Sequence, residues 1–108
     1  MKATRKRKTA RRGKTKTFPY DVAEHLRTPE EMAAYLDAWL SDYPEDSAGI
    51  ARALGDVARA AGMAQLARDT GLSRESLYKA LSDSGNPSLD TVLRVAKALG
   101  LRLRAAAA

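Results

Sequence analysis

The chain contains no cysteine, and its 108 residues include one histidine, one tryptophan and one phenylalanine. Without cysteine the protein has no disulfide, no thiol nucleophile and no cysteine ligand for zinc. His25 has no metal-ligand spacing around it, so we interpret it as a surface side chain of a helix. The apolar runs are too short to cross a membrane or to form a signal peptide. We therefore expect a soluble, cytoplasmic protein.

Motifs typical of enzymes are missing as well. The sequence has no Walker loop, no dinucleotide-binding glycine fingerprint and no Gly-x-Ser-x-Gly turn. Two carboxylate pairs, Glu30 with Glu31 and Glu45 with Asp46, fall at predicted helix starts, where acids offset the helix dipole. The sequence thus predicts no catalytic residue, no cofactor, no metal site and no small-molecule substrate.

Basic and acidic residues are segregated along the chain. Residues 1–16 carry nine lysines or arginines and no acid, residues 17–51 have a net charge of −7, and residues 52–108 have a net charge of +4. Residues 1–17 combine like charges with few apolar side chains, which predicts a disordered basic arm. Such an arm could contact DNA phosphates, or it could serve only to keep the protein soluble.

Residues 18–44 form a predicted helical extension. Thr28 and Glu31 have the spacing of a capping box, with Pro29 at the first helical position, so we expect a helix over residues 28–40. Its apolar side chains recur on one face, namely Met32, Tyr35, Leu36, Trp39 and Leu40. We interpret this stripe as core.

Aromatic residues of the extension support a second interpretation. Tyr35 and Trp39 are of the types enriched at protein interfaces, so their stripe could instead contact a partner. Phe18 and Tyr20 flank Pro19 in a segment that we expect to be extended. These two aromatic residues could pack on the protein's own domain or contact the same partner.

A helical domain is predicted over residues 45–104. We expect a helix from Glu45 to Ala61, ended by Gly62, with Arg52 and Arg59 on its solvent side. A loop at residues 83–87 then leads to a last helix. Its start is capped by Ser88, its end is at Gly100, and its expected apolar stripe is Leu89, Val92, Leu93, Ala96 and Leu99.

The end of the chain alternates apolar and basic residues. Residues 101–104 have the period of a half-buried strand, and this strand could pair with the same segment of a second subunit. The predicted fold is all-α, a compact bundle of about five helices with, at most, this one short C-terminal strand.

Residues 62–81 predict two short helices joined by a tight turn. Gly71 stands where the chain must adopt a left-handed backbone conformation. Ser73 is a preferred N-cap for the second helix, and Leu77 and Leu81 recur four apart on its buried side. This spacing predicts a helix-turn-helix, in which the second helix enters the major groove of DNA.

This region resembles the helix-turn-helix of phage-repressor-type (Cro/C1, lambda-repressor-like) regulators. The longer run from Phe18 to Leu103 is similar to the addiction-module antidote proteins, the HigA-like antitoxins. The specific blocks are Ser-Arg-Glu-Ser-Leu-Tyr-Lys at residues 73–79 and Gly-Asn-Pro at residues 85–87. The repressor pattern usually begins its first helix with glutamine; that position is Met63 here, and Gln65 follows two residues later.

The resemblance implies which side chains would read DNA. Base-reading positions fall on Ser73, Arg74, Glu75 and Lys79, whereas Ser76, Tyr78 and Gln65 suit phosphates. Arginine can bond guanine through two hydrogen bonds, and glutamate can accept one from cytosine. The alternative is a solvated helix face with an ion pair between Glu75 and Lys79.

The resemblance also implies a function and its partners. The chain would be an antitoxin that neutralises a RelE/ParE-superfamily toxin, aided by its N-terminal segment, and that represses its own operon as a homodimer on operator DNA. Acidic residues 17–51 suit a basic toxin. Two alternatives remain: a stand-alone phage-type repressor without a toxin, and an interaction module that uses the Trp39 face and has no preference for any DNA sequence.

Overall fold

Five α-helices make up the part of the chain that the computed structural model describes, residues 25–82 and 84–108, and no strand occurs in it. The helices are α1 (Pro29–Asp42), α2 (Ser47–Ala61), α3 (Met63–Thr70), α4 (Arg74–Ala80) and α5 (Leu89–Ala98). The all-α prediction is confirmed. The arm at residues 1–17, together with Phe18 and Tyr20, lies outside the described residues.

Local signals place the helix starts as expected. At α1, the Glu31 amide donates to Thr28 Oγ1 at 3.1 Å and the Thr28 amide donates to Glu31 Oε1 at 3.2 Å, which completes the capping box. Ser73 and Ser88 cap α4 and α5 through hydrogen bonds of 3.0 and 3.1 Å from backbone amides. Asp46 caps α2 in the same way. The N-caps predicted at Thr28, Ser73 and Ser88 are confirmed, whereas α2 begins at Ser47, two residues after the expected Glu45.

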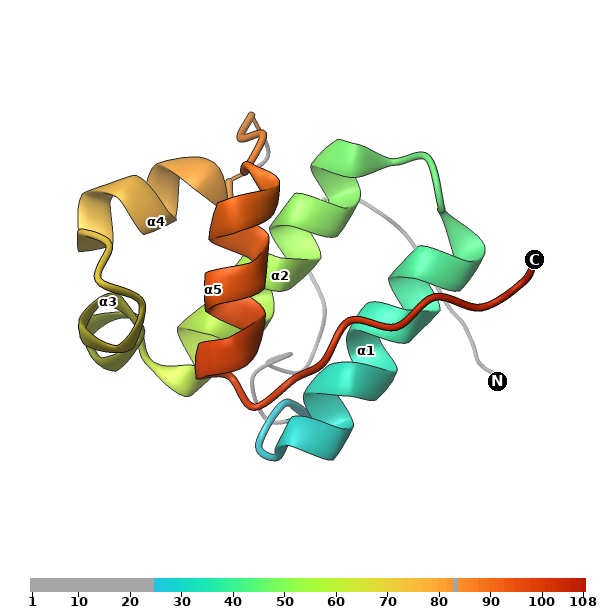
Figure 1. The fold of residues 1–108 in the computed structure, drawn as a ribbon, viewed down its shortest axis with the longest axis horizontal. Helices are drawn as coiled ribbons and strands as arrows, with labels where there is room; N and C mark the ends of the chain where they lie inside the picture. The colour runs from blue at the N-terminus through green and yellow to red at the C-terminus, as the bar shows by residue number, and fades with distance from the viewer. Residues whose placement is uncertain (1–24, 83) are drawn as a thin grey trace.

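One continuous core joins all five helices. It contains the buried side chains Leu26, Met32, Leu54, Val57, Ala58, Met63, Leu66, Leu77, Leu81, Val95 and Leu99. Helix α1 packs on α2, and α3 contacts α2, α4 and α5. Figure 1 shows α1 at one side of the molecule and α3 with α4 at the other, with α2 and α5 between them. The core therefore holds α4 far from α1.

The expected apolar stripe of α5 is partly wrong. Leu89 and Leu93 are 69% and 48% exposed, whereas Val95, Ala96 and Leu99 are buried. The buried side of α5 faces α3. Packing against α3 therefore buries the stripe that contains Val95 and leaves out the one that contains Leu89. Leu89 and Leu93 lie on a neighbouring stripe of the helix that the described residues leave largely exposed.

The C-terminal segment is not a strand. Gly100 ends α5 with a φ of 79°, and the Leu101 amide donates to the Ala96 carbonyl oxygen at 2.8 Å. Leu101 is half-buried, and the following residues continue without regular structure past α1 in the view of Figure 1. Because the described part of this chain contains no other strand, residues 101–104 have no sheet to join.

Candidate nucleic-acid interface

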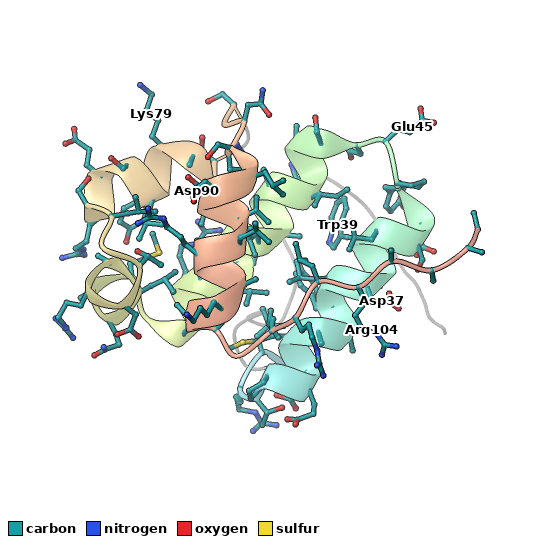
Figure 2. The ribbon with its side chains drawn as sticks, in the orientation of Figure 1. Asp37, Trp39, Glu45, Lys79, Asp90 and Arg104 are labelled. Atoms are coloured by element: carbon teal, nitrogen blue, oxygen red, sulfur yellow. The ribbon has the colours of Figure 1, made fainter. Side chains whose placement is uncertain are left out.

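Helix α4 has one side buried in the core and the other side exposed to solvent. Leu77 and Leu81 are almost fully buried, at 0% and 1% exposure. The polar side chains of the helix are all exposed: Arg74, Glu75, Ser76, Tyr78 and Lys79. In Figure 2 the labelled Lys79 projects away from the body of the protein. The α4 face, defined by these five side chains, is accessible to a partner.

The turn before α4 is built from local bonds. Gly71 has a φ of 78° and ends α3, and its amide donates to the Ala67 carbonyl oxygen at 3.0 Å. Thr70 Oγ1 donates to the Leu66 carbonyl oxygen at 2.8 Å and accepts from the Leu72 amide at 3.2 Å. These bonds fix the direction in which the chain leaves α3, and hence the direction of α4.

One long-range contact helps to set the position of the α3–α4 pair. The Arg94 guanidinium on α5 donates to the Thr70 carbonyl oxygen at 3.0 Å and to Asp90 Oδ2 at 3.0 Å. A cation suits this place because the C-terminal end of α3 is its negative end. Sequence reasoning missed Arg94, since its bond to Thr70 joins residues 24 positions apart.

A close approach between α2 and the end of α4 also helps to fix the position of α4. Gly55 on α2 lies so near Leu81 that a Cβ at Gly55 would collide with the Leu81 backbone oxygen. Glycine therefore allows α4 to lie directly against α2, and a larger residue would push it away.

The charged side chains of the α4 face have no intramolecular partner among the described residues. Arg74, Glu75 and Lys79 form no ion pair there, so the alternative pair between Glu75 and Lys79 is not present. The hydroxyls of Ser73 and Ser76 are 2.9 Å apart and hydrogen-bonded to each other. Two cations and one carboxylate thus remain available for an external ligand.

Gln65 is exposed on α3, but its amide is already engaged. Its Nε2 donates to Asp69 Oδ1 at 2.8 Å, and its Oε1 accepts from the Arg68 guanidinium at 2.7 Å. Because Nε2 carries two N–H donors, one of them can bond a phosphate while the other stays on Asp69.

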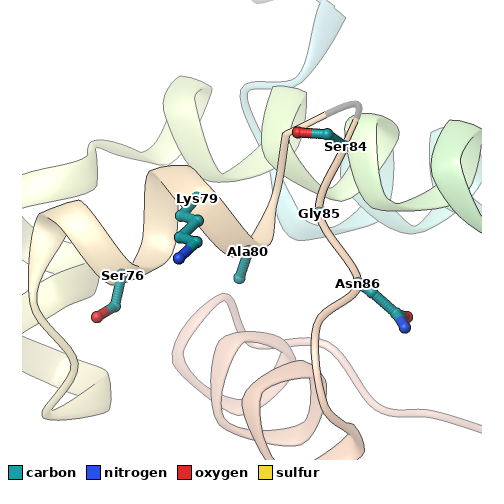
Figure 3. A pocket seen from close by; sticks show the side chains of 6 residues that line it. All are labelled: Ser76, Lys79, Ala80, Ser84, Gly85 and Asn86. Atoms are coloured by element: carbon teal, nitrogen blue, oxygen red, sulfur yellow. The ribbon is translucent and has the colours of Figure 1, made fainter.

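A hollow of about 330 Å³ lies beside the C-terminal end of α4. Figure 3 shows the six residues that line it: Ser76, Lys79, Ala80, Ser84, Gly85 and Asn86. A Cβ at Gly85 would collide with the backbone oxygens of Lys79 and Ala80, so glycine lets the loop pass close to the helix. The hollow belongs to the same surface as the α4 face, because Ser76 and Lys79 are part of both.

The aromatic residues proposed for a partner, Tyr35 and Trp39, are half-buried between α1 and α2. Tyr35 Oη donates to Asp56 Oδ2 at 2.7 Å, and Arg59 donates to the other oxygen of Asp56 at the same distance. Burial and the Asp56 carboxylate raise the pKa of Tyr35. This network joins α1 to α2 within the chain.

Trp39 is enclosed by its own chain in the same way. Its ring lies 5.2 Å from the Tyr43 ring and 5.5 Å from the Arg52 guanidinium carbon. A Cβ at Gly49 would also touch it. Arg52, expected on the solvent side of α2, is half-buried there, because its guanidinium lies over the Trp39 ring.

The outer side of α1 and the loop after it are acidic. Glu30, Asp37, Asp42, Glu45 and Asp46 are all exposed. Leu40 and Tyr43 are exposed within this region, at 47% and 54%. These seven residues define the acidic α1 surface. Figure 1 shows α1 on the opposite side of the molecule from α4, and in Figure 2 Asp37 and Glu45 lie on that side, away from Lys79.

Other kinds of site were sought in residues 25–82 and 84–108. No cluster of histidine, cysteine, aspartate or glutamate in this part of the chain could hold a metal ion. No described helix is both long enough and apolar enough to cross a bilayer. The α4 face and the acidic α1 surface remain as the candidate sites.

The chain belongs to the family of probable addiction module antidote proteins, whose family model matches residues 16–107. The chain is also 52% identical, over 85 residues, to an uncharacterized protein of Haemophilus influenzae (strain ATCC 51907 / DSM 11121 / KW20 / Rd); the alignment covers 79% of this chain and 86% of that protein. No solved structure matches the chain.

The family gives the coarse function. An antidote protein acts against a toxin, so membership implies a toxin partner and an antitoxin role. Antidote proteins are typically not enzymes.

Proposed function

We propose that this protein is the antitoxin of a type II toxin-antitoxin module, in which it neutralises a RelE/ParE-like toxin and represses its own operon. In this proposal the α3–α4 pair is a helix-turn-helix of the lambda-repressor kind, and α4 enters the major groove. The DNA-binding part of the proposal rests on the α4 face. Arg74 and Lys79 are exposed there and form no ion pair with the described residues.

The side chains of the α4 face divide into two groups by their chemistry. Arg74, at the first position of α4, can donate two hydrogen bonds to guanine O6 and N7. Glu75 can accept from the amino group of cytosine, and Lys79 can contact a second guanine or a phosphate. Ser76 and Tyr78 are suited to phosphates, which position the helix without reading sequence.

The hollow beside α4 extends this surface. Lys79 and the hydroxyl of Ser84 line it, and Gly85 brings the loop backbone close to the helix. The Lys79 ammonium and the Ser84 hydroxyl could bond a phosphate of the DNA backbone there, since lysine and hydroxyl groups are common phosphate donors.

A single α4 helix is too short for useful specificity. Its 7 residues span about 10 Å, which corresponds to a few base pairs. Two copies on a palindrome, with half-sites about one helical turn apart, would supply the rest. The functional form that we propose on DNA is therefore a homodimer.

The toxin would bind at the other side of the molecule. The acidic α1 surface suits a basic partner, and Leu40 with Tyr43 would supply its apolar contacts. Because Tyr35 and Trp39 are engaged between α1 and α2, their role would be to support this surface.

DNA binding is tested with the DNA upstream of the protein's own gene in a mobility-shift assay. We expect Arg74→Ala to weaken binding by about 1–3 kcal/mol, because one bidentate contact to a guanine is lost. Arg102→Ala removes an exposed arginine of the C-terminal segment and serves as the control. Equal affinity of wild type and Arg74→Ala would contradict the assignment.

The antitoxin role is tested by co-expression with the product of the adjacent open reading frame. We expect this chain to restore growth and to co-purify with that product. If it does neither while DNA binding persists, the stand-alone repressor is the better description. If the chain also shows no preference for any DNA sequence, only an interaction module remains.

A further inference from the structure

Arg94 is a side chain of α5 that reaches the turn between α3 and α4. Its Nη1 donates to the Thr70 carbonyl oxygen at 3.0 Å, and its Nε donates to Asp90 Oδ2 at 3.0 Å. A Cβ at Gly71 would lie 3.8 Å from the same Nη1, so the guanidinium lies against the turn itself. Arg94 therefore joins the turn to α5.

The carbonyl that accepts this bond has no partner within its own helix. Thr70 is the last residue of α3, and the last four carbonyls of an α-helix lack an intrahelical donor. The helix dipole adds negative charge at the same end, which suits a guanidinium. The Thr70 hydroxyl is engaged elsewhere, because it donates to the Leu66 carbonyl oxygen and accepts from the Leu72 amide. The donor to the Thr70 carbonyl comes from α5 instead.

Asp90 determines where the Arg94 guanidinium points. Arginine has many rotamers, and bonds at two different nitrogens hold this side chain in one of them. An exposed ion pair contributes little to stability, and the side chains of Asp90 and Arg94 are 72% and 49% exposed. The main contribution of Asp90 is therefore the direction of the guanidinium.

We propose that Arg94 is a positioning residue for DNA recognition, which acts through the Thr70 carbonyl to fix the direction of α4. The inference rests on the proposed function, in which the α4 face reads base edges. Arg74, the first residue of α4, follows the turn directly, so a change of direction at the turn displaces its side chain. Hydrogen bonds to base edges depend on distance and angle and are lost by such a displacement. Arg94 thus contributes to the choice of DNA sequence without touching a base.

A direct contact from Arg94 to a phosphate is the alternative, since only two of its nitrogens are bonded within the chain. The two explanations predict different results. A lost phosphate contact lowers the slope of affinity against salt by about 1, and it weakens binding to all sequences alike. A displaced α4 leaves the salt slope unchanged and weakens binding to the operator only.

The first test compares Arg94→Met with Lys97→Met in the full chain. Both substitutions remove an exposed cation from α5, but Lys97 forms no ion pair among the described residues. We expect Arg94→Met to raise the dissociation constant for the operator about tenfold, as for the loss of one charge-assisted hydrogen bond. Lys97→Met measures the effect of the lost charge alone, which should stay within about twofold.

The same variants are measured on unrelated DNA and over a range of salt concentrations. We expect Arg94→Met to keep the salt slope of the wild type and to bind unrelated DNA as Lys97→Met does. Arg94→Lys keeps the charge but lacks the planar fork that bonds both partners, so its operator affinity should lie between those of the wild type and Arg94→Met. Circular dichroism confirms that each variant is folded at the temperature of the assay.

Asp90→Asn gives a test in which the direction of the change decides. Removal of an acid makes the net charge more positive, which ordinarily strengthens binding to DNA. If Asp90 directs the Arg94 guanidinium, Asp90→Asn should instead weaken operator binding. Asp37→Asn makes the same change of charge at an exposed position of α1 and should not weaken it. Stronger operator binding by Asp90→Asn would contradict the role of Asp90.

Hydrogen exchange, measured by NMR without DNA, separates this inference from the proposed function. The amides of Leu77 in α4 and Met32 in α1 are both hydrogen-bonded to backbone carbonyls. We expect Arg94→Met to speed the exchange of Leu77 relative to Met32, because α4 has lost a support that α1 never had. Lys97→Met should leave the ratio of the two rates unchanged.

Three outcomes distinguish the possibilities. Operator affinity equal to that of the wild type in Arg94→Met overturns the inference and leaves the proposed function intact. A salt slope that falls by about 1 in the same variant also overturns it, because Arg94 then contacts a phosphate. If the exchange of Leu77 speeds up as expected in a chain that prefers no DNA sequence, the repressor role fails, and the support of α4 by Arg94 stands.

Discussion

At the scale of single residues, Gly71 determines how the chain passes from α3 to α4. Its φ of 78° lies in the left-handed region, which costs a residue with a Cβ roughly 1–2 kcal/mol. We therefore expect Gly71→Ala to lower the free energy of unfolding by about that amount in urea denaturation. Gly71→Asn is the control, since asparagine tolerates this conformation better and should cost less. Equal losses in both variants would contradict the explanation.

Tyr35 couples the stability of the protein to alkaline pH. Burial and the neighbouring Asp56 carboxylate raise the pKa of Tyr35, so the folded state favours the neutral phenol. The pKa of Tyr35 is higher in the folded state than in the unfolded state, where it is about 10. Its contribution to the free energy of unfolding is therefore fully present below about pH 10 and is lost as the pH rises through the pKa of the folded state. We expect the free energy of unfolding to fall above about pH 10 for this reason.

Tyr35→Phe isolates this effect from the titration of lysines and other tyrosines. The variant loses the hydrogen bond to Asp56, which should cost about 1 kcal/mol near neutral pH. Its free energy of unfolding should then decline less steeply than that of the wild type above about pH 10. Tyr78→Phe, at a residue that is 45% exposed, should keep the slope of the wild type. Parallel slopes for Tyr35→Phe and the wild type would show that Tyr35 is not the group involved.

At the scale of elements, the contact between α2 and α4 depends on Gly55. Alanine in place of glycine inside a helix usually stabilises it by about 0.5–1 kcal/mol. At Gly55 the new Cβ would meet the Leu81 backbone oxygen, and such overpacking typically costs about 1–3 kcal/mol. We expect Gly55→Ala to lower the melting temperature and to weaken DNA binding through displacement of α4. A raised melting temperature would contradict the close approach.

Local signals predict the ends of the helices because a cap uses neighbouring residues only. Thr28, Ser73 and Ser88 each bond an amide three residues ahead, so the sequence itself contains both partners. The left-handed position at Gly71 is predictable for the same reason. These elements, and the exposed side of α4 that follows from them, could be assigned before the structure was known.

Tertiary packing decides the features that the sequence does not predict. Leu89 and Leu93 have the same helical spacing as the buried side chains of α5, and only the position of α3 selects between the two stripes. The alternation at residues 101–104 predicts a strand, but a strand needs a neighbour that the described part of the chain does not supply. Arg94 bonds Thr70 across 24 residues, and no local pattern indicates such a contact.

At the scale of the whole molecule, the two proposed partners have separate surfaces. Helices α4 and α1, which carry the α4 face and most of the acidic α1 surface, lie at opposite sides of the molecule in Figure 1, with α2 and α5 between them. In the proposed arrangement, the protein would bind a toxin and an operator at the same time. Binding of one partner should therefore be separable by mutation from binding of the other.

This separation gives the last prediction, made on one protein with two assays. Asp42→Lys reverses an exposed charge of the acidic α1 surface, and Asp69→Lys makes the same change at an exposed position of α3. We expect Asp42→Lys to weaken toxin binding by about 1 kcal/mol, roughly fivefold, with operator affinity unchanged. Arg74→Ala should show the opposite pattern. Calorimetry with the purified toxin and mobility shifts on operator DNA measure the two affinities. If Asp42→Lys and Asp69→Lys lose the same toxin affinity, the net charge of the protein governs toxin binding, and the acidic α1 surface does not.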